Sequence, residues 1–414
     1  MTASAALEGG PVSRTERAFP GLDGARAIAA TAVVATHAAF WTGSYTQDTA
    51  GRALSQLTVG VAIFFVLSGF LLSRPLFLAA AQGHPRPRTA AYLWRRGLRI
   101  LPLYWLTVAA AFLLLPDRPG RDASTWVQHL TLTQVYGVGR LAPDLSHTWS
   151  LCVEVSFYLV LPLLAAGLLR LSGGSGWRPA RLLALLAVLG LLGSIWLGTL
   201  WHARLSVAPF DLWLPAYAGW FGAGMAMAVL SVSAPGWRPR RLAGQLGDSL
   251  ATCWAAAAVL FWLSATPLAS TSGQGWMSAG QAVTSNLLHL GVATLLVWPL
   301  VFGDQSAGWT RHVLTSRPVV FLGEISYGLF LTHVLVLTGG YALFGRQFSG
   351  DLGWVFAGTW IAGVAVATVA HLLVERPLRR WRDLVPDHGR DGTPTPSDGS
   401  AATTTAASAT SAST

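Results

Sequence analysis

Repeated apolar segments of membrane-crossing length are the feature that most constrains the fold of this chain. It has 414 residues, of which 52% are hydrophobic and 11% charged, and its mean hydropathy is +0.48. Soluble domains typically carry about 25% charged residues, and a helix needs roughly 20 apolar residues to cross a bilayer. The pattern therefore predicts an all-α, polytopic membrane helical bundle of about ten transmembrane helices, over 25–43, 59–80, 100–116, 151–170, 180–200, 213–231, 250–267, 285–302, 318–340 and 353–374.

The arginines indicate an orientation for these spans. All 28 basic residues are arginine, and 22 of them fall in alternate segments when the ten spans are drawn. Because basic residues are enriched on the cytoplasmic side of membranes, both termini are expected to be cytoplasmic. The same distribution explains the formal net charge of +10 without a nucleic-acid partner. Exclusive use of arginine fits codon bias, so we expect a multi-pass protein of the plasma (cytoplasmic) membrane of a GC-rich bacterium.

Polar ends flank the apolar region. Residues 1–17 are predicted to be a polar N-terminal tail, since they contain no apolar stretch typical of a signal peptide. Residues 18–383 are expected to form one membrane domain. Residues 384–414 are rich in Asp, Gly, Pro, Ser, Thr and Ala, which cannot bury enough apolar surface to offset the entropy of ordering. This segment is predicted to be a disordered C-terminal tail.

Two ionisable residues share one face of the first predicted span. Arg26 and His37 are eleven residues apart, which is within about 20° of three full helical turns and about 16 Å along the axis. Ionisable residues in a membrane segment usually face a protein interior or water cavity and carry function. The pair therefore indicates a functional stripe. The alternatives are an arginine that only sets orientation and a histidine that is satisfied within the core.

The expected topology sorts the remaining ionisable residues into two layers. The outer layer holds His37, Glu154 and His333, a set suited to acid–base chemistry near neutral pH. The inner layer is suited to binding phosphates, and it consists of Arg26, Arg74, Arg95, Arg96 and Arg99. A cytosolic phosphorylated donor with a long thin arm fits this arrangement, and acyl-CoA is the obvious example. The alternatives are ordinary positive-inside arginines and a structural role for Glu154.

Smaller polar and aromatic residues complete the candidate site as substrate-contacting or structural groups: Ser68, Trp149, Tyr158, Ser326 and Tyr327. Ser326 is seven residues before His333 and shares its helix face. Trp149 and Tyr158 fit an interfacial aromatic belt better than substrate contact. No metal site is expected.

Six motifs in order resemble the landmarks of the acyltransferase-3 family of integral membrane acyltransferases: LDGARAIAATAVVATH, FFVLSGFLLSR, RRGLRILPLYW, HTWSLCVEVSFY, ISYGLFLTH and VERP. The resemblance implies transfer of an acyl group, acetyl or short-chain, from cytosolic acyl-CoA to a hydroxyl. It implies that His37 is the base or acyl-relay residue and that Arg26 binds or positions the donor. Glu154 and His333 match landmarks without a defined individual role.

The resemblance also implies the partners. Acyl-CoA is expected as a co-substrate with no permanently bound cofactor, and the acceptor as a hydroxyl-bearing glycan, lipid-linked sugar or secondary metabolite within reach of the lipid bilayer. Stand-alone members of this size include antibiotic-modifying macrolide O-acyltransferases.

Two mechanisms and two other classes of protein remain open at this point. His37 either removes the proton of the acceptor hydroxyl directly or is acylated first. A transporter or flippase would use the same ionisable residues as a proton relay or cargo site, although no inverted repeat is evident. A non-catalytic assembly or sensor protein would tolerate the loss of both His37 and Arg26.

Overall fold

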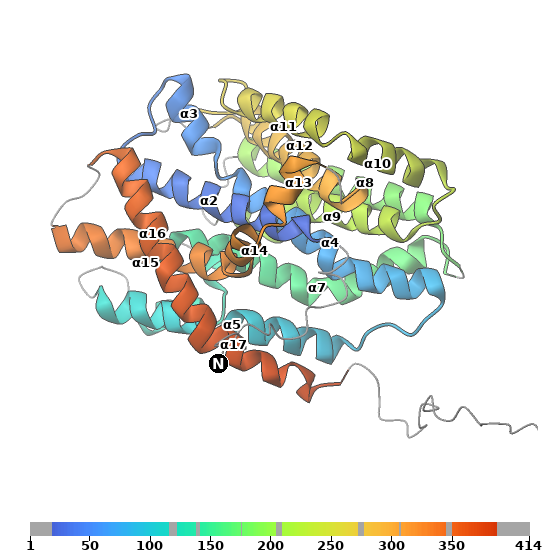
Figure 1. Ribbon diagram of the computed structural model, residues 1–414, viewed down its shortest axis with the longest axis horizontal. Helices are drawn as coiled ribbons and strands as arrows, with labels where there is room; N and C mark the ends of the chain where they lie inside the picture. Colours follow the sequence, from blue (N-terminus) through green and yellow to red (C-terminus); the bar gives the residue numbers. More distant parts are fainter. Residues whose placement is uncertain are drawn as a thin grey trace, which may run out of the picture.

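The computed structural model of the chain is built from helices (Figure 1). It describes residues 19–115, 122–137, 141–174, 176–203, 209–271, 277–305, 308–344 and 350–386, and no β-strand occurs among them. The predicted N-terminal tail and residues 387–414 of the predicted C-terminal tail lie outside this described part. The all-helical architecture confirms the predicted fold class.

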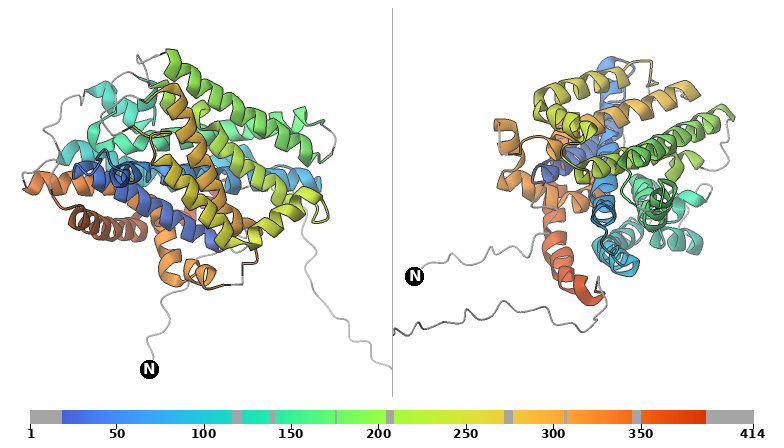
Figure 2. Two further views of the ribbon diagram at one scale, coloured as in Figure 1. Left: turned by 90° about the horizontal axis from the view of Figure 1, so that it is seen from above. Right: turned by 90° about the vertical axis from the view of Figure 1, so that its right-hand side faces the viewer.

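Across the described ranges, ten long helices form the bundle, and they cross one another at different angles (Figure 2). Their bounds are α2 (Gly21–Trp41), α4 (Val59–Gln82), α5 (Thr89–Leu114), α7 (Trp149–Leu171), α8 (Pro179–Ala203), α9 (Ala218–Val232), α11 (Leu250–Ser264), α12 (Ala279–Phe302), α15 (Ser326–Phe344) and α16 (Leu352–Ala370). The shorter α-helices are α3 (Thr49–Gln56), α6 (Ala123–Leu130), α10 (Arg238–Asp248), α13 (Trp309–Leu314), α14 (Arg317–Glu324) and α17 (Arg376–Leu378). Tighter or wider turns are η1 (Gln134–Tyr136), η2 (Pro143–Thr148), η3 (Phe210–Leu212), η4 (Leu214–Tyr217), η5 (His371–Glu375, a π-helix) and η6 (Arg379–Leu384).

Within the described residues, eight helical stretches are long and apolar enough to cross a membrane, and a bent pair of helices can supply a ninth. The chain is therefore a multi-pass helical membrane protein. Helix α2 is 21 residues long but is not among these eight. It contains both Arg26 and His37, and it packs against α4, α14, α15 and α16. The number of spans is thus eight or nine by length and composition, compared with about ten predicted, and the orientation of the termini stays a prediction.

Two predicted spans are interrupted. The span predicted at 250–267 is the second half of a pair, because α10 and α11 meet at an angle of 84°. Buried Arg311 donates hydrogen bonds from Nη2 to the carbonyls of Gly247 (2.9 Å) and Pro299 (3.1 Å), which satisfies a carbonyl at the end of α10. The span predicted at 318–340 is divided between α14 and α15. Both breaks depend on contacts distant in sequence, so local hydropathy does not reveal them.

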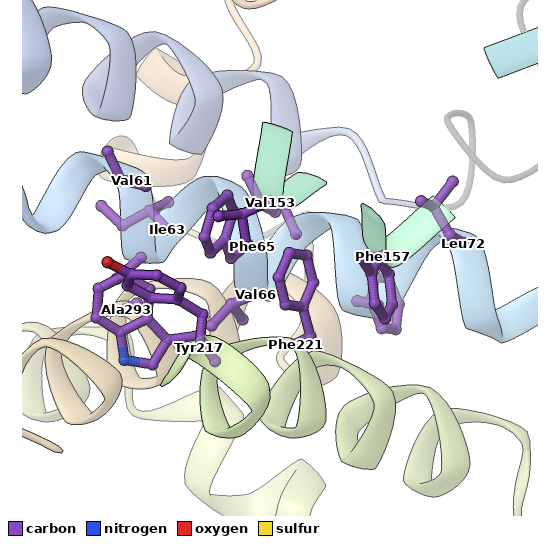
Figure 3. Close-up of a cluster of buried hydrophobic side chains, with 14 of the residues drawn as sticks. Val61, Ile63, Phe65, Val66, Leu72, Val153, Phe157, Tyr217, Phe221 and Ala293 are labelled. Carbon is purple, nitrogen blue, oxygen red and sulfur yellow. The ribbon is translucent and has the colours of Figure 1, made fainter. Parts of the chain in front are cut away.

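Helices α4 and α9 are in direct backbone contact at the centre of the bundle. A Cβ atom built on Gly69 would lie 2.2 Å from the carbonyl oxygen of Phe221, and one on Gly224 would lie 2.1 Å from that of Val66. Only glycine permits this approach, which is a common way of packing membrane helices. Beside the contact, the rings of Phe65, Phe221 and Phe157 form a stack with centroid separations of 4.5 and 4.1 Å (Figure 3). Of the three rings, Phe65 lines the cavity of the candidate site.

The segment from α6 to η2 is tied to the bundle by buried polar groups. The Tyr104 hydroxyl donates to the carbonyl of His129 at 2.7 Å. Gln134 Nε2 donates to the Thr148 hydroxyl at 3.0 Å, and that hydroxyl donates to the carbonyl of Leu145 at 2.6 Å. Because buried polar groups are costly unless they are hydrogen-bonded, this network fixes the short helical turn that precedes α7.

Candidate active site

Three histidines from three separate segments meet inside the bundle. His37 comes from α2, His147 from η2 and His333 from α15. The ring centroids lie 4.9 Å apart for His37 and His333, 5.0 Å for His147 and His333, and 6.1 Å for His37 and His147. The side chains of His147 and His333 are buried, at 3% and 0% exposure. We call these three residues the histidine cluster.

Neighbouring carbonyls define which ring nitrogens carry protons, because a carbonyl oxygen can only accept a hydrogen bond. Nδ1 of His333 lies 2.6 Å from the carbonyl oxygen of Phe330, so it carries the hydrogen and Nε2 is an acceptor. That Nε2 lies 3.2 Å from Nδ1 of His37, which is also 2.8 Å from the carbonyl oxygen of Val33. Nδ1 of His37 is therefore a donor. The lone pair of neutral His37 is consequently on Nε2.

A cavity of about 80 Å³ with a partly polar lining reaches Phe330, whose ring packs against His147 and His333 of the histidine cluster. It is formed between α2, α4, α5, α7 and α15, and its polar lining consists of Arg26, Ser68, Arg96, Arg99, Ser150, Glu154, Tyr158, Ser326 and Tyr327. Three guanidinium groups face one carboxylate in this lining. We call this space the arginine cavity.

Glu154 is held in place by two hydroxyl groups. Its Oε1 accepts a hydrogen bond from Ser68 on α4 at 2.5 Å and another from Tyr158, one turn further along α7, at 2.7 Å. Hydrogen bonds to the ionised form stabilise a carboxylate. Two donors on a single oxygen fix the orientation of the carboxylate beside the arginines.

Three of the five predicted donor-binding arginines line the cavity: Arg26, Arg96 and Arg99. Arg26 also forms an ion pair with Asp23, one turn before it on α2. Nε of Arg96 is buried and has no hydrogen-bond partner among the described residues. Arg74 and Arg95 are not part of the lining. Arg74 instead lies over the ring of Phe19, with 5.2 Å between its guanidinium carbon and the ring centroid.

Glu154 and His147 differ from the sequence interpretation. The predicted outer layer grouped Glu154 with His37 and His333, whereas the structure places Glu154 in the arginine cavity with Ser68. The third member of the cluster is His147, which the sequence interpretation passed over. His147 opens the same motif seven residues before Glu154, but it lies in the 3-10 turn η2 and not on α7. The available signal was therefore only a second ionisable residue in the same motif.

Phe330 lies between the two sites. Its side chain lines the arginine cavity, and its ring centroid is 5.4 Å from that of His147 and 6.1 Å from that of His333. Phe64, which also lines the cavity, packs on Phe330 at 6.1 Å. An aromatic partition therefore separates the arginine cavity from the histidine cluster.

The other predicted substrate-contacting residues divide between the lining and the packing around it. Ser326 and Tyr327 line the cavity, and the Tyr327 hydroxyl donates to the carbonyl of Ile100 at 2.8 Å. Trp149 is not in the lining and packs against Tyr217, with 5.2 Å between ring centroids. Within the described part of the chain, no group of three or more His, Cys, Asp and Glu side chains is arranged to hold a metal ion.

A membrane-embedded bundle with buried imidazoles and a cationic cavity is suited to group transfer, and comparison with known proteins identifies the family of this chain. Residues 19–376 match the family profile described as an acyltransferase domain. The chain therefore belongs to this family of membrane acyltransferases, as the six motifs predicted, and it is an O-acyltransferase. This membership favours the enzyme interpretation over a transporter or an assembly protein.

Individual relatives are distant in sequence. The chain is 28% identical to acyltransferase MdmB of Streptomyces mycarofaciens over 396 residues, which cover 87% of this chain and 92% of the relative. It is 25% identical to nodulation protein 10 of Rhizobium leguminosarum, over 78% of this chain and 82% of the relative. It is 23% identical to peptidoglycan O-acetyltransferase OatA of Listeria monocytogenes, over 77% of this chain and 49% of the relative, so it spans about half the length of that enzyme. No solved structure matches the chain.

Proposed function

We propose that this protein transfers an acetyl or other short acyl group from cytosolic acyl-CoA to a hydroxyl of a glycan or sugar-bearing metabolite. The observation that carries the proposal is the position of the arginine cavity directly beside the histidine cluster, with Phe330 between them. The cavity supplies cations for an anionic donor, and the cluster supplies neutral imidazoles for proton transfer.

The donor side of the site is built for phosphate or thioester groups. Arg26, Arg96 and Arg99 line the cavity with Glu154 as the only lining carboxylate, so the lining carries a net positive charge. Guanidinium groups bind phosphates through charge-assisted hydrogen bonds. The buried Nε of Arg96, which lacks a partner among the described residues, is available to such a ligand. The positive-inside prediction places these arginines on the cytoplasmic side, where acyl-CoA is found.

The transfer chemistry is assigned to Nε2 of His37. In the direct mechanism, this nitrogen takes the proton of the acceptor hydroxyl while the oxygen attacks the thioester carbonyl carbon. The C–S bond then breaks, and the CoA thiolate receives that proton. His333 accepts the hydrogen bond from Nδ1 of His37 and stabilises the imidazolium that forms. In the other mechanism, Nε2 attacks the thioester and carries the acyl group before the acceptor takes it.

Glu154 has a positioning role in this proposal. Its Oε1 is occupied by the hydroxyls of Ser68 and Tyr158, and it lies in the arginine cavity rather than in the histidine cluster. A fixed carboxylate among three arginines fixes their positions and reduces the repulsion between their positive charges.

The acceptor is assigned by analogy. One relative is named a peptidoglycan O-acetyltransferase, and transfer to a sugar hydroxyl is the shared chemistry that we extend to this chain. Lipid-linked sugars and secondary metabolites that carry sugars belong to the same class. We place the enzyme in the plasma membrane with both termini in the cytoplasm.

The test uses membranes that contain wild-type protein, His37→Gln or His289→Gln. His289 is also a buried histidine in a long helix, but it lies beside Trp220 and outside both sites. With labelled acetyl-CoA and an extract of glycans, lipids and metabolites, wild type and His289→Gln should release CoA and label an acceptor. His37→Gln should lose at least about 100-fold in rate.

Equal rates for wild type and folded His37→Gln would overturn the assignment of His37. Accumulation of a labelled solute in vesicles without release of CoA would overturn acyl transfer and favour the transporter. Mass spectrometry of the labelled product identifies the acceptor.

A further inference from the structure

His147 has an unused acceptor nitrogen inside the histidine cluster. Its Nε2 lies 3.0 Å from the carbonyl oxygen of Leu331, so Nε2 carries the hydrogen and donates it. The lone pair of the neutral ring is then on Nδ1, which is buried and has no hydrogen-bond partner among the described residues. A buried acceptor left without a partner destabilises the fold, because it has lost its hydrogen bond to water. Its presence at a reaction centre therefore needs an explanation.

The surroundings of His147 distinguish it from an ordinary buried histidine. His289 also has a buried ring nitrogen without a partner among the described residues, but it lies beside the ring of Trp220 and away from the histidine cluster. His147 lies 6.1 Å from His37 between ring centroids, and its ring plane is inclined at 76° to that of His37. The cluster thus contains two lone pairs that no described residue occupies, Nε2 of His37 and Nδ1 of His147.

Direct transfer uses only one of these lone pairs. If His37 takes the acceptor proton, Nδ1 of His147 has no function, because a hydroxyl has one proton to give. If His37 carries the acyl group, its Nε2 is bonded to carbon and cannot act as a base. A second base is then required for the acceptor hydroxyl, and His147 is the neutral imidazole with an unused nitrogen beside it.

We propose that the two histidines divide the reaction: His37 is the acyl carrier and His147 is the general base that deprotonates the acceptor. This inference rests on the proposed acyl-CoA-dependent function. In the first step, Nε2 of His37 attacks the thioester carbon, the C–S bond breaks, and the CoA thiolate leaves. In the second step, the acceptor oxygen attacks the acyl carbon while its proton passes to Nδ1 of His147. The C–N bond to His37 breaks, and the proton on His147 returns to the thiolate through solvent.

The segment that carries His147 is suited to holding a base in position. The hydroxyl of Thr148 bonds the carbonyl of Leu145 and is itself bonded by Gln134. The Ser150 hydroxyl donates to the carbonyl of His147 at 3.2 Å. The Nε2 bond to Leu331 then fixes the ring on α15. These contacts hold the ring without using Nδ1.

The discriminating variant is His147→Gln in the full-length protein. The glutamine amide can still donate to the carbonyl of Leu331, as Nε2 does, but it provides no base at the position of Nδ1. Water serves as a minimal hydroxyl acceptor, so the assay needs only radiolabelled acetyl-CoA. The measurement is CoA release resolved in time, together with label bound to the protein. His37→Gln and His289→Gln are the matched variants.

Wild type and His289→Gln should release CoA continuously. His147→Gln should release about one CoA per protein in a burst and retain the label, followed by turnover at least about 100-fold slower than wild type. His37→Gln should show neither burst nor label. The burst itself reports that His147→Gln is folded and binds the donor.

Three results would overturn the division of roles: turnover of His147→Gln at the wild-type rate, slower linear release without a burst, or no release at all while His289→Gln is active. Failure of the proposed function is distinguishable from these. Equal release of CoA by wild type and His37→Gln would show that His37 does not carry out the transfer. No release of CoA by the wild type, with water or with any sugar, would contradict the proposed function and would remove this inference as well.

Discussion

Nδ1 of His37 lies 3.2 Å from Nε2 of His333 on α15 and 2.8 Å from the carbonyl oxygen of Val33, so its one hydrogen is shared between these two acceptors. This contact orients His37 and stabilises positive charge on it. His333→Gln should lower kcat about 10- to 100-fold with little change in the KM for acetyl-CoA, because we propose that the donor binds in the arginine cavity and not at His333. Steady-state kinetics on purified protein measure both constants. A rise in KM with kcat unchanged would contradict this role.

Substitution of an arginine should affect the KM for acetyl-CoA only if that arginine lines the arginine cavity. Arg99 lines the arginine cavity, whereas Arg74 does not and lies over Phe19. Arg99→Gln should raise the KM for acetyl-CoA about tenfold because a charge-assisted bond to the donor is lost, and Arg74→Gln should leave it within about twofold. Titration of CoA binding to membranes reports the same difference without catalysis. Equal effects of the two substitutions would indicate a general electrostatic contribution instead.

The aromatic partition should control acyl chain length. Phe330 separates the arginine cavity from His147 and His333. Phe330→Ala removes most of that side chain, so we expect the ratio of hexanoyl to acetyl transfer to rise at least about tenfold. Competition between the two acyl-CoAs in one reaction gives the ratio directly. Phe112→Ala, at a buried ring packed on Trp126, is the control and should leave the ratio unchanged.

The contact between α4 and α9 should not tolerate a methyl group. Gly69→Ala would bring Cβ to 2.2 Å from the carbonyl oxygen of Phe221, so the helices must separate at a cost of about 1–3 kcal/mol or more. Gly167 in α7 has nothing within 4 Å of the same built atom. Thermal unfolding in detergent should therefore show a lower Tm for Gly69→Ala and an unchanged or higher Tm for Gly167→Ala. The opposite order would refute close packing at this site.

His129 should make stability depend on pH. It is buried in α6, outside the spans, and burial lowers its pKa below the usual value of 6.5. The unfolded chain therefore binds a proton at higher pH than the folded one, so the contribution of His129 is complete above about pH 6.5 and is lost as pH falls further. The loss of Tm between pH 7.5 and 5.5 should be smaller for His129→Asn than for wild type. An identical loss in both would show that His129 does not titrate differently on folding.

Local sequence properties account for the overall class of fold. The apolar segments predicted helices of membrane length, and each predicted span contains a helix. This prediction is robust because hydropathy is averaged over many residues. The break between Glu324 and Ser326 and the bend near Asp248 were not predictable in this way. They depend on close packing of Gly323 against Asp23 and on the hydrogen bonds of Arg311.

The candidate site was predictable only in part, for a related reason. Arg26 and His37 lie on one helix, so spacing alone related them. Glu154 was assigned to the outer layer from its estimated depth in the membrane. That estimate contains no information about the hydrogen bond from Ser68, which holds the carboxylate beside the arginines. His147 is placed by the turn η2, whose geometry depends on Gln134 and the buried network around it. Residues positioned by tertiary hydrogen bonds leave little trace in hydropathy.

One surface of α15 serves both sites. In sequence order it carries two residues of the cavity lining, the aromatic partition and the partner of His37: Ser326, Tyr327, Phe330 and His333. Each residue advances a helix by about 100°. Inserting or deleting one residue between Tyr327 and His333 would therefore rotate either the cavity-lining residues or His333 out of the bundle while the other remained in place. Homologues with a working site should differ in composition along this stretch but agree in its length, and their insertions and deletions should fall outside it.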